Sequence, residues 1–325
     1  MEGEDCMHGW ALDVIVPVFN EAELLRDFHA RLSAALATLP ARVRFLYVND
    51  GSTDGTGTVL RELARRDPGI VVIELVRNFG HQAALAAGLD HADADAVIMM
   101  DGDGQHPPEL IPEMVKLWEK GYEVVQAQRL DDPGKLSFKQ ATARAFYWLA
   151  SRIGELPLVQ GGADFRLISR PVLLALGQLR EYHRFYRGLI PWLGFRTAIV
   201  PFRPQPRLAG KTKYSLRKML KLAGAGLFSF SLLPLKVGIF FGALFVLLAV
   251  LELAYIAGLW LSGRQHLLVP GWSSIIVLLT LGLGALMLLI GFVGIYVGMI
   301  FQEVKERPVY VVRAVIGKGT ETTQN

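Results

Sequence analysis

Two long apolar segments near the C-terminal end limit what this chain can fold into more than any other feature. Val237–Leu261 contains one acid, Glu252, and no base, and Ser274–Phe301 contains no charged residue. Each segment exceeds the ~20 residues that a helix needs to cross the hydrocarbon core of a bilayer. Soluble helices are rarely apolar on every face over such a length. The sequence therefore predicts a transmembrane domain of two helices over residues 233–303.

The charges around these segments predict their orientation. Residues 211–236 and 304–313 carry many bases, whereas the connecting loop Ser262–Gly271 has one arginine, Arg264. Because loops rich in lysine and arginine stay in the cytoplasm, we expect both flanks there. An acid at the level of Glu252 is costly in lipid, so we expect it to face protein, such as a second subunit. A face of small residues also predicts a homo-oligomer through the transmembrane helices, namely Gly282, Gly284, Gly291, Gly294 and Gly298.

The remainder of the chain has the composition of a cytoplasmic globular domain. There is one cysteine, Cys6, so no intrachain disulfide is possible. Met1–Trp10 is acidic and lacks an apolar stretch, which predicts no signal peptide. A basic cluster precedes the first apolar segment within residues 211–232, comprising Lys211, Lys213, Arg217, Lys218 and Lys221. It is either a solvated face or, beside a membrane, a surface for anionic headgroups or a phosphate ligand.

Strand-like and helix-like segments alternate through the first 130 residues. The predicted strands are Leu12–Val18, Val43–Val48, Ile70–Leu75, Ala96–Met100 and Glu123–Ala127, and the predicted helices are Glu21–Leu39, Asp54–Arg66, His81–His91 and Pro108–Lys120. Such alternation indicates an α/β fold with a mostly parallel, Rossmann-like sheet. Ligands of these sheets bind beyond the carboxyl ends of the strands, so the following loops are where we expect chemistry. A later helix, Ser137–Ile153, is amphipathic and lies either in the membrane interface or in the soluble core.

The loop after the fourth predicted strand carries the clearest chemical pattern. Asp101 and Asp103 are separated by one glycine directly after an apolar strand. Mg²⁺ binds through one or two carboxylates together with substrate phosphates, so the pair predicts a divalent cation holding a diphosphate. A simple turn is the alternative, because Asp-Gly pairs are common in turns. His106 is expected to support this loop rather than bind the metal, since imidazole suits softer ions.

Other loop residues give weaker indications. Asp50 follows the second strand beside two glycines and could accept hydrogen bonds from a base or ribose, and Glu21 begins a helix. Arg77 and Arg129 follow strands three and five and could meet phosphate, although surface arginines are equally consistent. Asp164 and Arg166 could form an internal ion pair or belong to the site. Neither early loop matches GxGxxG or a P-loop, which disfavours a dinucleotide or ATP site, and no feature indicates nucleic-acid binding.

Together these motifs identify a resemblance to the family 2 glycosyltransferases of the GT-A fold. Within that family the chain is similar to the polyisoprenyl-phosphate glycosyltransferases, such as bactoprenol glucosyltransferases and dolichol-phosphate mannose synthases. The matching segments span Val16 to about Ser215 and read VPVFNE from Val16, NDGSTDGT from Asn49, RNFGHQAALAAGLD from Arg77, DGDGQHPPE from Asp101, GADFRL from Gly162 and GKTKYS from Gly210. Family members usually read DADLQ where this chain has Gly104, which puts the role of Gln105 in doubt.

The resemblance implies a role for individual residues. Those expected at the nucleotide-sugar are Pro17, Asn20, Glu21, Asp50, Arg77 and Arg129. Asp101, Asp103 and Gln105 would hold Mg²⁺ or Mn²⁺ and the diphosphate. Asp164 would lie near the reacting centre, so that Asp101, Asp103 and Asp164 are the candidate catalytic residues. Arg207, Lys211 and Lys213 would hold the lipid phosphate.

The resemblance also implies an activity and a location. We expect an inverting transfer of a sugar, with UDP-glucose favoured, to undecaprenyl phosphate at the bacterial inner membrane, for the cell envelope or lipopolysaccharide. The expected domains are a cytoplasmic catalytic domain (1–210), a juxtamembrane segment (211–232), the transmembrane domain and a cytoplasmic tail (304–325). One alternative is a processive polysaccharide synthase, but the QxxRW-type motif is not met, because Glu181 follows Arg180. The other is a non-enzymatic membrane component that senses nucleotide-sugars.

Overall fold

The computed structural model describes residues 9–130, residues 162–203 except 180 and 183, scattered positions from 240 to 263, and residues 271–323 except 318 and 319. The chain divides into two units, one of residues 1–219 with 308–325 and one of residues 220–307. The predicted amphipathic helix Ser137–Ile153, the basic segment 211–232 and about half of the first apolar segment lie outside the described residues.

The centre of the first unit is a sheet whose middle strands are parallel. These strands are β1 (Trp10–Val18), β2 (Ala41–Asn49), β3 (Ile70–Leu75) and β4 (Ala96–Met99). They lie in the order β4-β1-β2-β3 within a sheet of nine described strands, β7-β5-β6-β4-β1-β2-β3-β8-β9. The predicted α/β fold with a parallel-dominated sheet is confirmed, and the predicted bounds of these strands differ from the observed ones by two residues or fewer.

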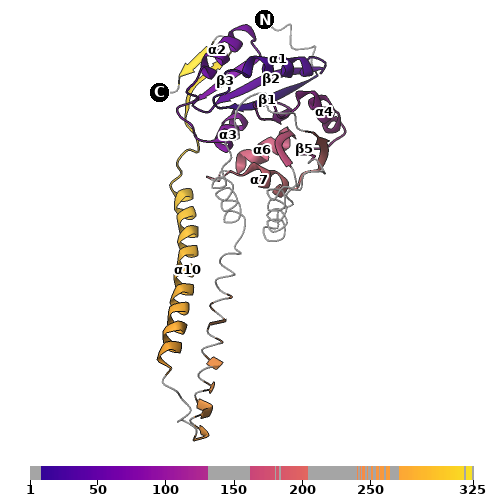
Figure 1. Cartoon of the computed structure of the whole chain (residues 1–325). Helices are drawn as coiled ribbons and strands as arrows, with labels where there is room; N and C mark the ends of the chain where they lie inside the picture. Colours follow the sequence, from indigo (N-terminus) through magenta and orange to yellow (C-terminus); the bar gives the residue numbers. More distant parts are fainter. Residues whose placement is uncertain are drawn as a thin grey trace. The chain divides into compact units, whose positions relative to one another are not determined.

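Helices cover both faces of the sheet (Figure 1). Those described between the first strands are α1 (Leu25–Leu36), α2 (Thr56–Arg66), α3 (His81–His91), the 3₁₀ turn η1 (Pro108–Leu110) and α4 (Ile111–Glu119). Alternate side chains of β1, such as Val14 and Val16, join the core formed with α1, α2 and α4. The opposite face of β1 meets α3, where a Cβ on Gly88 would lie 2.3 Å from Ile15 Cγ2. Both faces of the central strands are therefore buried, as expected for parallel strands.

The second half of the unit adds strands of both directions. These elements are β5 (Val124–Arg129), β6 (Gly162–Ser169), α6 (Arg170–Gln178), α7 (Tyr186–Trp192) and β7 (Thr197–Phe202). Strand β6 runs antiparallel to both β4 and β5, with Met99 opposite Arg166. Because β4 and β6 run in opposite directions, the start of β6 lies beside the end of β4. This brings Asp164 next to the loop that carries Asp101 and Asp103.

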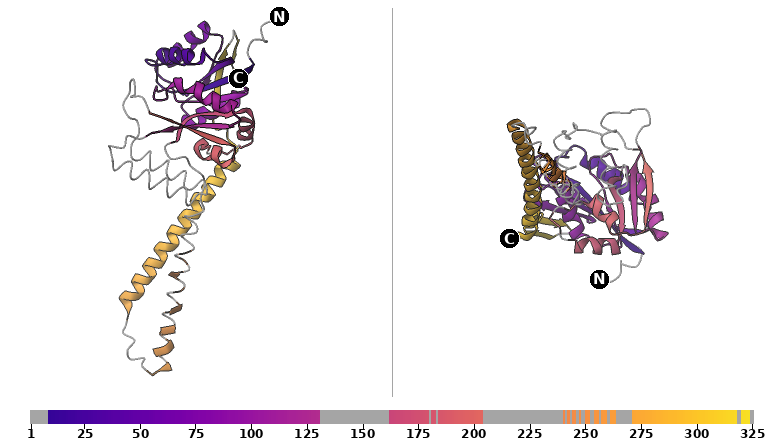
Figure 2. Two further views of the ribbon diagram at one scale, coloured as in Figure 1. Left: turned by 90° about the vertical axis from the view of Figure 1, so that its right-hand side faces the viewer. Right: turned by 90° about the horizontal axis from the view of Figure 1, so that it is seen from below.

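The C-terminal residues extend the sheet at its other edge. Strand β8 (Val312–Gly317) pairs antiparallel with β3, and β9 (Thr320–Thr323) pairs with β8. These strands are yellow in Figures 1 and 2. A cytoplasmic tail was expected over residues 304–325, but residues from 308 onward belong to the first unit and include these two strands of its sheet.

The second unit contains one long described helix, α10 (Trp272–Val304), of 33 residues. At 1.5 Å per residue it is about 50 Å long, more than the thickness of a bilayer core. Among the described residues, Leu281–Val304 is the one helical segment long and apolar enough to cross a membrane. This agrees with the second predicted apolar segment, and the described residues do not test the first.

Candidate active site

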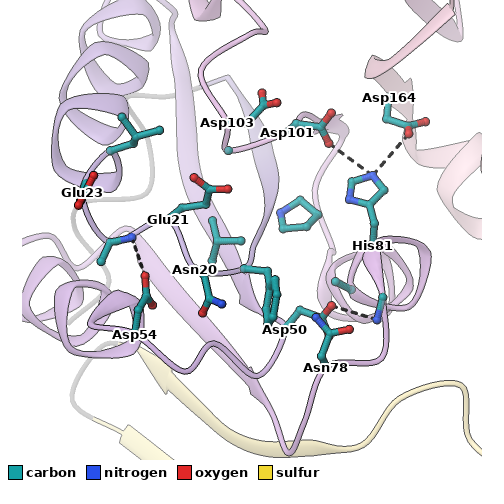
Figure 3. A pocket seen from close by; sticks show the side chains of 18 of the residues that line it. Asn20, Glu21, Glu23, Asp50, Asp54, Asn78, His81, Asp101, Asp103 and Asp164 are labelled. Carbon is teal, nitrogen blue, oxygen red and sulfur yellow. Dashed lines mark hydrogen bonds and ion pairs between the residues drawn. The ribbon is translucent and has the colours of Figure 1, made fainter. Parts of the chain in front are cut away.

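A pocket of about 560 Å³ opens at the carboxyl ends of the parallel strands. Its walls come from the loops after β1, β2, β3 and β4, from the start of β6 and from α7. The seven acids among the described residues of these walls are labelled in Figure 3, namely Glu21, Glu23, Asp50, Asp54, Asp101, Asp103 and Asp164. Among the described residues of the walls, the basic side chains are His81 and Arg187. Such an excess of negative charge favours a cation over a free anion in this pocket.

The loops after β1 and β2 are held together by hydrogen bonds from Asn20. Its side-chain oxygen accepts a hydrogen bond from the Thr53 N–H at 2.8 Å, and its own N–H donates to Ser52 Oγ at 3.0 Å. Asn20 has a φ of 56°, in the left-handed region that asparagine tolerates better than most residues. The loop after β2 also needs Gly51, whose φ is 64° and where a Cβ would lie 2.3 Å from the carbonyl carbon of Arg77.

Asp50 connects the loop after β2 to the loop after β3. Its two carboxylate oxygens accept hydrogen bonds from the backbone N–H groups of Phe79 at 2.7 Å and Gly80 at 3.0 Å. Burial raises the pKa of Asp50, and these two hydrogen bonds oppose the shift. The carboxylate therefore fixes the loop that begins α3. A carboxylate oxygen can accept more than one hydrogen bond, so the predicted contact with a base or ribose stays a prediction.

Hydrogen bonds within the loop after β4 fix the positions of Asp101 and Asp103. The backbone N–H of Asp101 donates to His106 Nδ1 at 3.0 Å, which places the proton of a neutral His106 on Nε2, 3.7 Å from Asp101 Oδ2. The buried His106 ring stacks on Phe165. Asp103 Oδ1 accepts a hydrogen bond from the N–H of Gln105 at 3.0 Å. Gly104 between them has a φ of 76°, which explains why glycine suits this position.

His81, at the start of α3, faces two carboxylates, one in the loop after β4 and one at the start of β6 (Figure 3). Its Nε2 is 3.4 Å from Asp101 Oδ1 and 3.4 Å from Asp164 Oδ2. Burial lowers the pKa of His81, but the two carboxylates outweigh it and raise the pKa to about 8. His81 therefore links the loop after β4 to the start of β6.

Asp164 is buried and surrounded by basic groups. Arg187 donates to its two oxygens, from Nε and from one terminal nitrogen, both at 2.8 Å. The buried Arg166 donates a third hydrogen bond at 3.2 Å. Although burial alone would raise it, the pKa of Asp164 lies well below its ordinary value because of Arg187, His81 and Arg166. Burial in turn lowers the pKa of Arg166 to about 10. The ion pair between Asp164 and Arg166 that the sequence left open does form.

Most of the predicted pocket residues come together, and some do not. Pro17, Asn20, Glu21, Asp50, Asp101, Asp103 and Asp164 all line the pocket. Gln105, Arg77 and Arg129 are not among its lining residues; Arg77 lies 4.0 Å above the ring of Phe79, and Arg129 is exposed at the end of β5. The predicted phosphate-binding residues Arg207, Lys211 and Lys213 lie outside the described residues. His81 and Arg187 also line the pocket but were not predicted as site residues.

The residues present fit a divalent ion that is held jointly with a substrate. Among the described residues no group of three or more His, Cys, Asp or Glu side chains forms a complete metal cage. Asp101 and Asp103 line the pocket and are partly exposed, so their oxygens can be reached from it. Mg²⁺ is commonly bound in this way, by one or two carboxylates with phosphates completing its shell.

Comparison with known proteins decides the family. The model of glycosyl transferase family 2 matches residues 13–173. The uncharacterized glycosyltransferase YkcC of Bacillus subtilis is 40% identical over 94% of this chain and 94% of its own length. The chain belongs to glycosyl transferase family 2. An uncharacterized glycosyltransferase of Synechocystis is 39% identical over 93% of this chain and 94% of that protein. The SfII prophage-derived bactoprenol glucosyl transferase of Shigella flexneri is 36% identical over 93% of this chain and 97% of that protein.

Membership in glycosyl transferase family 2 gives the pocket its general chemistry. This chain is a glycosyltransferase, and the pocket at the carboxyl ends of β1, β2 and β4 lies within the matched residues, apart from Arg187. The resemblance that the sequence motifs indicated is confirmed. The assignment of individual residues remains a proposal.

Proposed function

We propose that this chain transfers a sugar, favoured to be glucose from UDP-glucose, to a polyprenyl phosphate such as undecaprenyl phosphate. One observation carries the proposal: Asp101, Asp103 and the loops after β1 and β2 line the same acidic pocket. The similarity to a bactoprenol glucosyl transferase over 97% of that protein supports a lipid phosphate as the acceptor. The apolar helix within α10 supports a membrane location.

In this proposal, Asp101 and Asp103 hold Mg²⁺ or Mn²⁺ against the donor diphosphate. The ion would neutralise charge on the leaving nucleoside diphosphate. Pro17, Asn20, Glu21 and Asp50 form the nucleotide end of the pocket. His106 keeps Asp101 in place by accepting a hydrogen bond from its N–H. Arg77, Arg129 and Gln105 stay proposed donor contacts on the strength of the sequence motifs, because none of them lines the pocket in this structure.

We assign Asp164 an orienting role rather than that of a general base. An effective base has a pKa near the working pH, whereas the basic neighbours of Asp164 keep its pKa well below the ordinary value. The acceptor needs no strong base, because a phosphate monoester with a second pKa of about 6 is already largely ionised at neutral pH. An acceptor oxygen would form the bond to the anomeric carbon while the bond to the diphosphate breaks and the diphosphate takes its electron pair. This single displacement inverts the anomeric configuration.

Two features support the membrane part of the proposal: the apolar helix of the second unit and the distribution of basic residues in the sequence. We propose two transmembrane helices, over Val237–Leu261 and within α10, in the bacterial inner membrane, with the catalytic domain and both termini in the cytoplasm. Arg207, Lys211 and Lys213 would bind the acceptor phosphate near the bilayer surface. The small-residue face of α10 supports a homo-oligomer as part of the same proposal.

The proposed reaction can be measured with the full-length protein in detergent. With UDP-[¹⁴C]glucose, undecaprenyl phosphate and Mg²⁺, we expect label in the organic phase and an equal amount of UDP released. EDTA should reduce both to background, and added Mn²⁺ or Mg²⁺ should restore them, because the pocket is too acidic to hold a diphosphate without a cation. UDP release that is independent of the lipid, or lipid glucosylation that EDTA leaves unchanged, would contradict the proposal. GDP-mannose and UDP-N-acetylhexosamines in parallel identify the preferred donor.

A further inference from the structure

The segment that follows α10 contacts the two ends of a stretch of chain, residues 76–90, that contains part of the pocket lining. Residues Tyr310 to Arg313 run beside the end of β3, where the Val76 N–H donates to the Val311 carbonyl at 3.1 Å and Arg313 donates to the Val76 carbonyl at 3.0 Å. The Tyr310 hydroxyl donates to Asp90 Oδ2 at 2.8 Å. Val76 and Asp90 are the two ends of one stretch of chain, which contains the loop after β3 and nearly all of α3.

That stretch carries part of the pocket. Asn78, Gly80, His81 and Ala84 line it, and the N–H groups of Phe79 and Gly80 are the ones that Asp50 binds. The pairing of β3 with β8 shifts register between Glu74 and Leu75, directly before this loop. Such irregularities bend a strand and redirect the residues that follow. The C-terminal strand thus contributes to the direction in which the loop leaves the sheet.

A second route leads from the same segment to Asp164. Asp90, which accepts the hydrogen bond from Tyr310, also lies 3.5 Å from Arg184. Arg184 interacts with the side chain of Tyr186, whose N–H donates to Gln82 of α3 and whose carbonyl accepts a hydrogen bond from Arg166. The next residue in the chain is Arg187, which holds the Asp164 carboxylate. One polar network therefore joins the C-terminal segment, α3 and α7.

We propose that Tyr310 and Arg313 are positioning residues of the donor site, and that strand β8 holds the 76–91 wall of the pocket in its binding geometry. The inference deepens the proposed function and rests on it, because it takes the ligand of this wall to be a nucleoside diphosphate sugar. The C-terminal segment then positions the donor site from outside, because none of its described residues lines the pocket.

The test uses the full-length Tyr310→Phe/Arg313→Gln variant and a control variant that loses an ion pair at the surface. Arg170→Gln removes an exposed ion pair with Asp93, at the opposite end of the strands from the pocket. Hydrogen exchange should become about fivefold faster in residues 76–91 of the double variant, as expected when exposed hydrogen bonds that restrain a segment are lost. The UDP dissociation constant and the donor KM should rise by a similar factor, kcat should change less than twofold, and the control should match the wild type.

Four results separate the possibilities. Unchanged exchange in residues 76–91 would overturn the proposal, and so would faster exchange spread evenly over the whole catalytic unit, which indicates a general stability role. Faster exchange confined to this wall with unchanged UDP affinity would overturn its role in donor binding. If the wild type neither binds nor turns over any nucleotide-sugar, the proposed function fails. The exchange data would still show whether strand β8 restrains residues 76–91.

Discussion

Asp103→Asn should reduce kcat/KM for transfer from the nucleotide-sugar to the lipid phosphate by about 10³-fold, the loss seen when one group that stabilises transition-state charge is removed. The substitution keeps the shape of the side chain, and an asparagine oxygen can still accept the hydrogen bond from the Gln105 N–H. Asp103 is partly exposed, so the fold should be unaffected. Steady-state kinetics over a range of Mn²⁺ concentrations measure kcat/KM, and thermal melting of the same sample shows whether the fold is intact.

A matched variant shows whether the effect is specific to the pocket. Glu109→Gln removes an acid from the same loop region, but Glu109 is exposed and pairs with Arg31 outside the pocket. It should keep kcat/KM within about twofold of the wild type, as surface changes of this kind usually do. If Asp103→Asn turned over at a similar rate to Glu109→Gln, the ion would have to be held elsewhere.

Asp164→Asn should have the largest effect on stability. It leaves Arg166, which is fully buried, and Arg187 without their anionic partner, and breaking a buried ion pair by removing one member costs about 3 kcal/mol or more. Chemical denaturation of the purified protein should show this loss of unfolding free energy. Activity must therefore be compared only under conditions where the variant is folded.

A double-mutant cycle with Arg187→Gln separates stability from catalysis. The two substitutions should be strongly non-additive in unfolding free energy, because the residues share two hydrogen bonds. If Asp164 orients the reactants, the folded Asp164→Asn variant should lose less than about 100-fold in kcat, below the usual range for a general base. A loss near 10⁴-fold with an intact fold would make Asp164 a base, and a trapped glycosyl-enzyme would refute single displacement.

The central fold could be predicted because its signals are local. Ile70–Leu75 and His81–His91 were predicted with the observed bounds, since an apolar strand and a helix after glycine are visible in short windows of sequence. The predicted helix Asp54–Arg66 ends as expected but begins two residues later, at Thr56 with Gly55 as its N-cap, and Asp54 lies before the helix, where it accepts a hydrogen bond from the Thr56 N–H. Strand β8 was missed because a short segment such as Val312–Gly317 gives no indication of which edge it will join.

The part of the site formed by the loops after the parallel strands could be predicted, and the rest could not. The loops after β1, β2 and β4 meet at one edge, which brought Asn20, Asp50 and Asp101 together as expected. The position of Asp164 depends on β6 being antiparallel, which alternation of elements does not reveal. Arg187 comes from a segment without any motif. His81 lay in a quoted motif, but its place between two carboxylates depends on tertiary packing.

The central claim is that Asp101 and Asp103 hold a divalent ion and a diphosphate in this pocket. A structure of the full-length protein with UDP-glucose and Mn²⁺, with the ion located by anomalous scattering, tests it most directly. We expect the ion within about 2.2 Å of an oxygen of Asp101 or Asp103 and of the diphosphate, close to the distance for hard cations of this size. Both carboxylates turned into packed protein, with the ion and nucleotide bound elsewhere, would contradict the account.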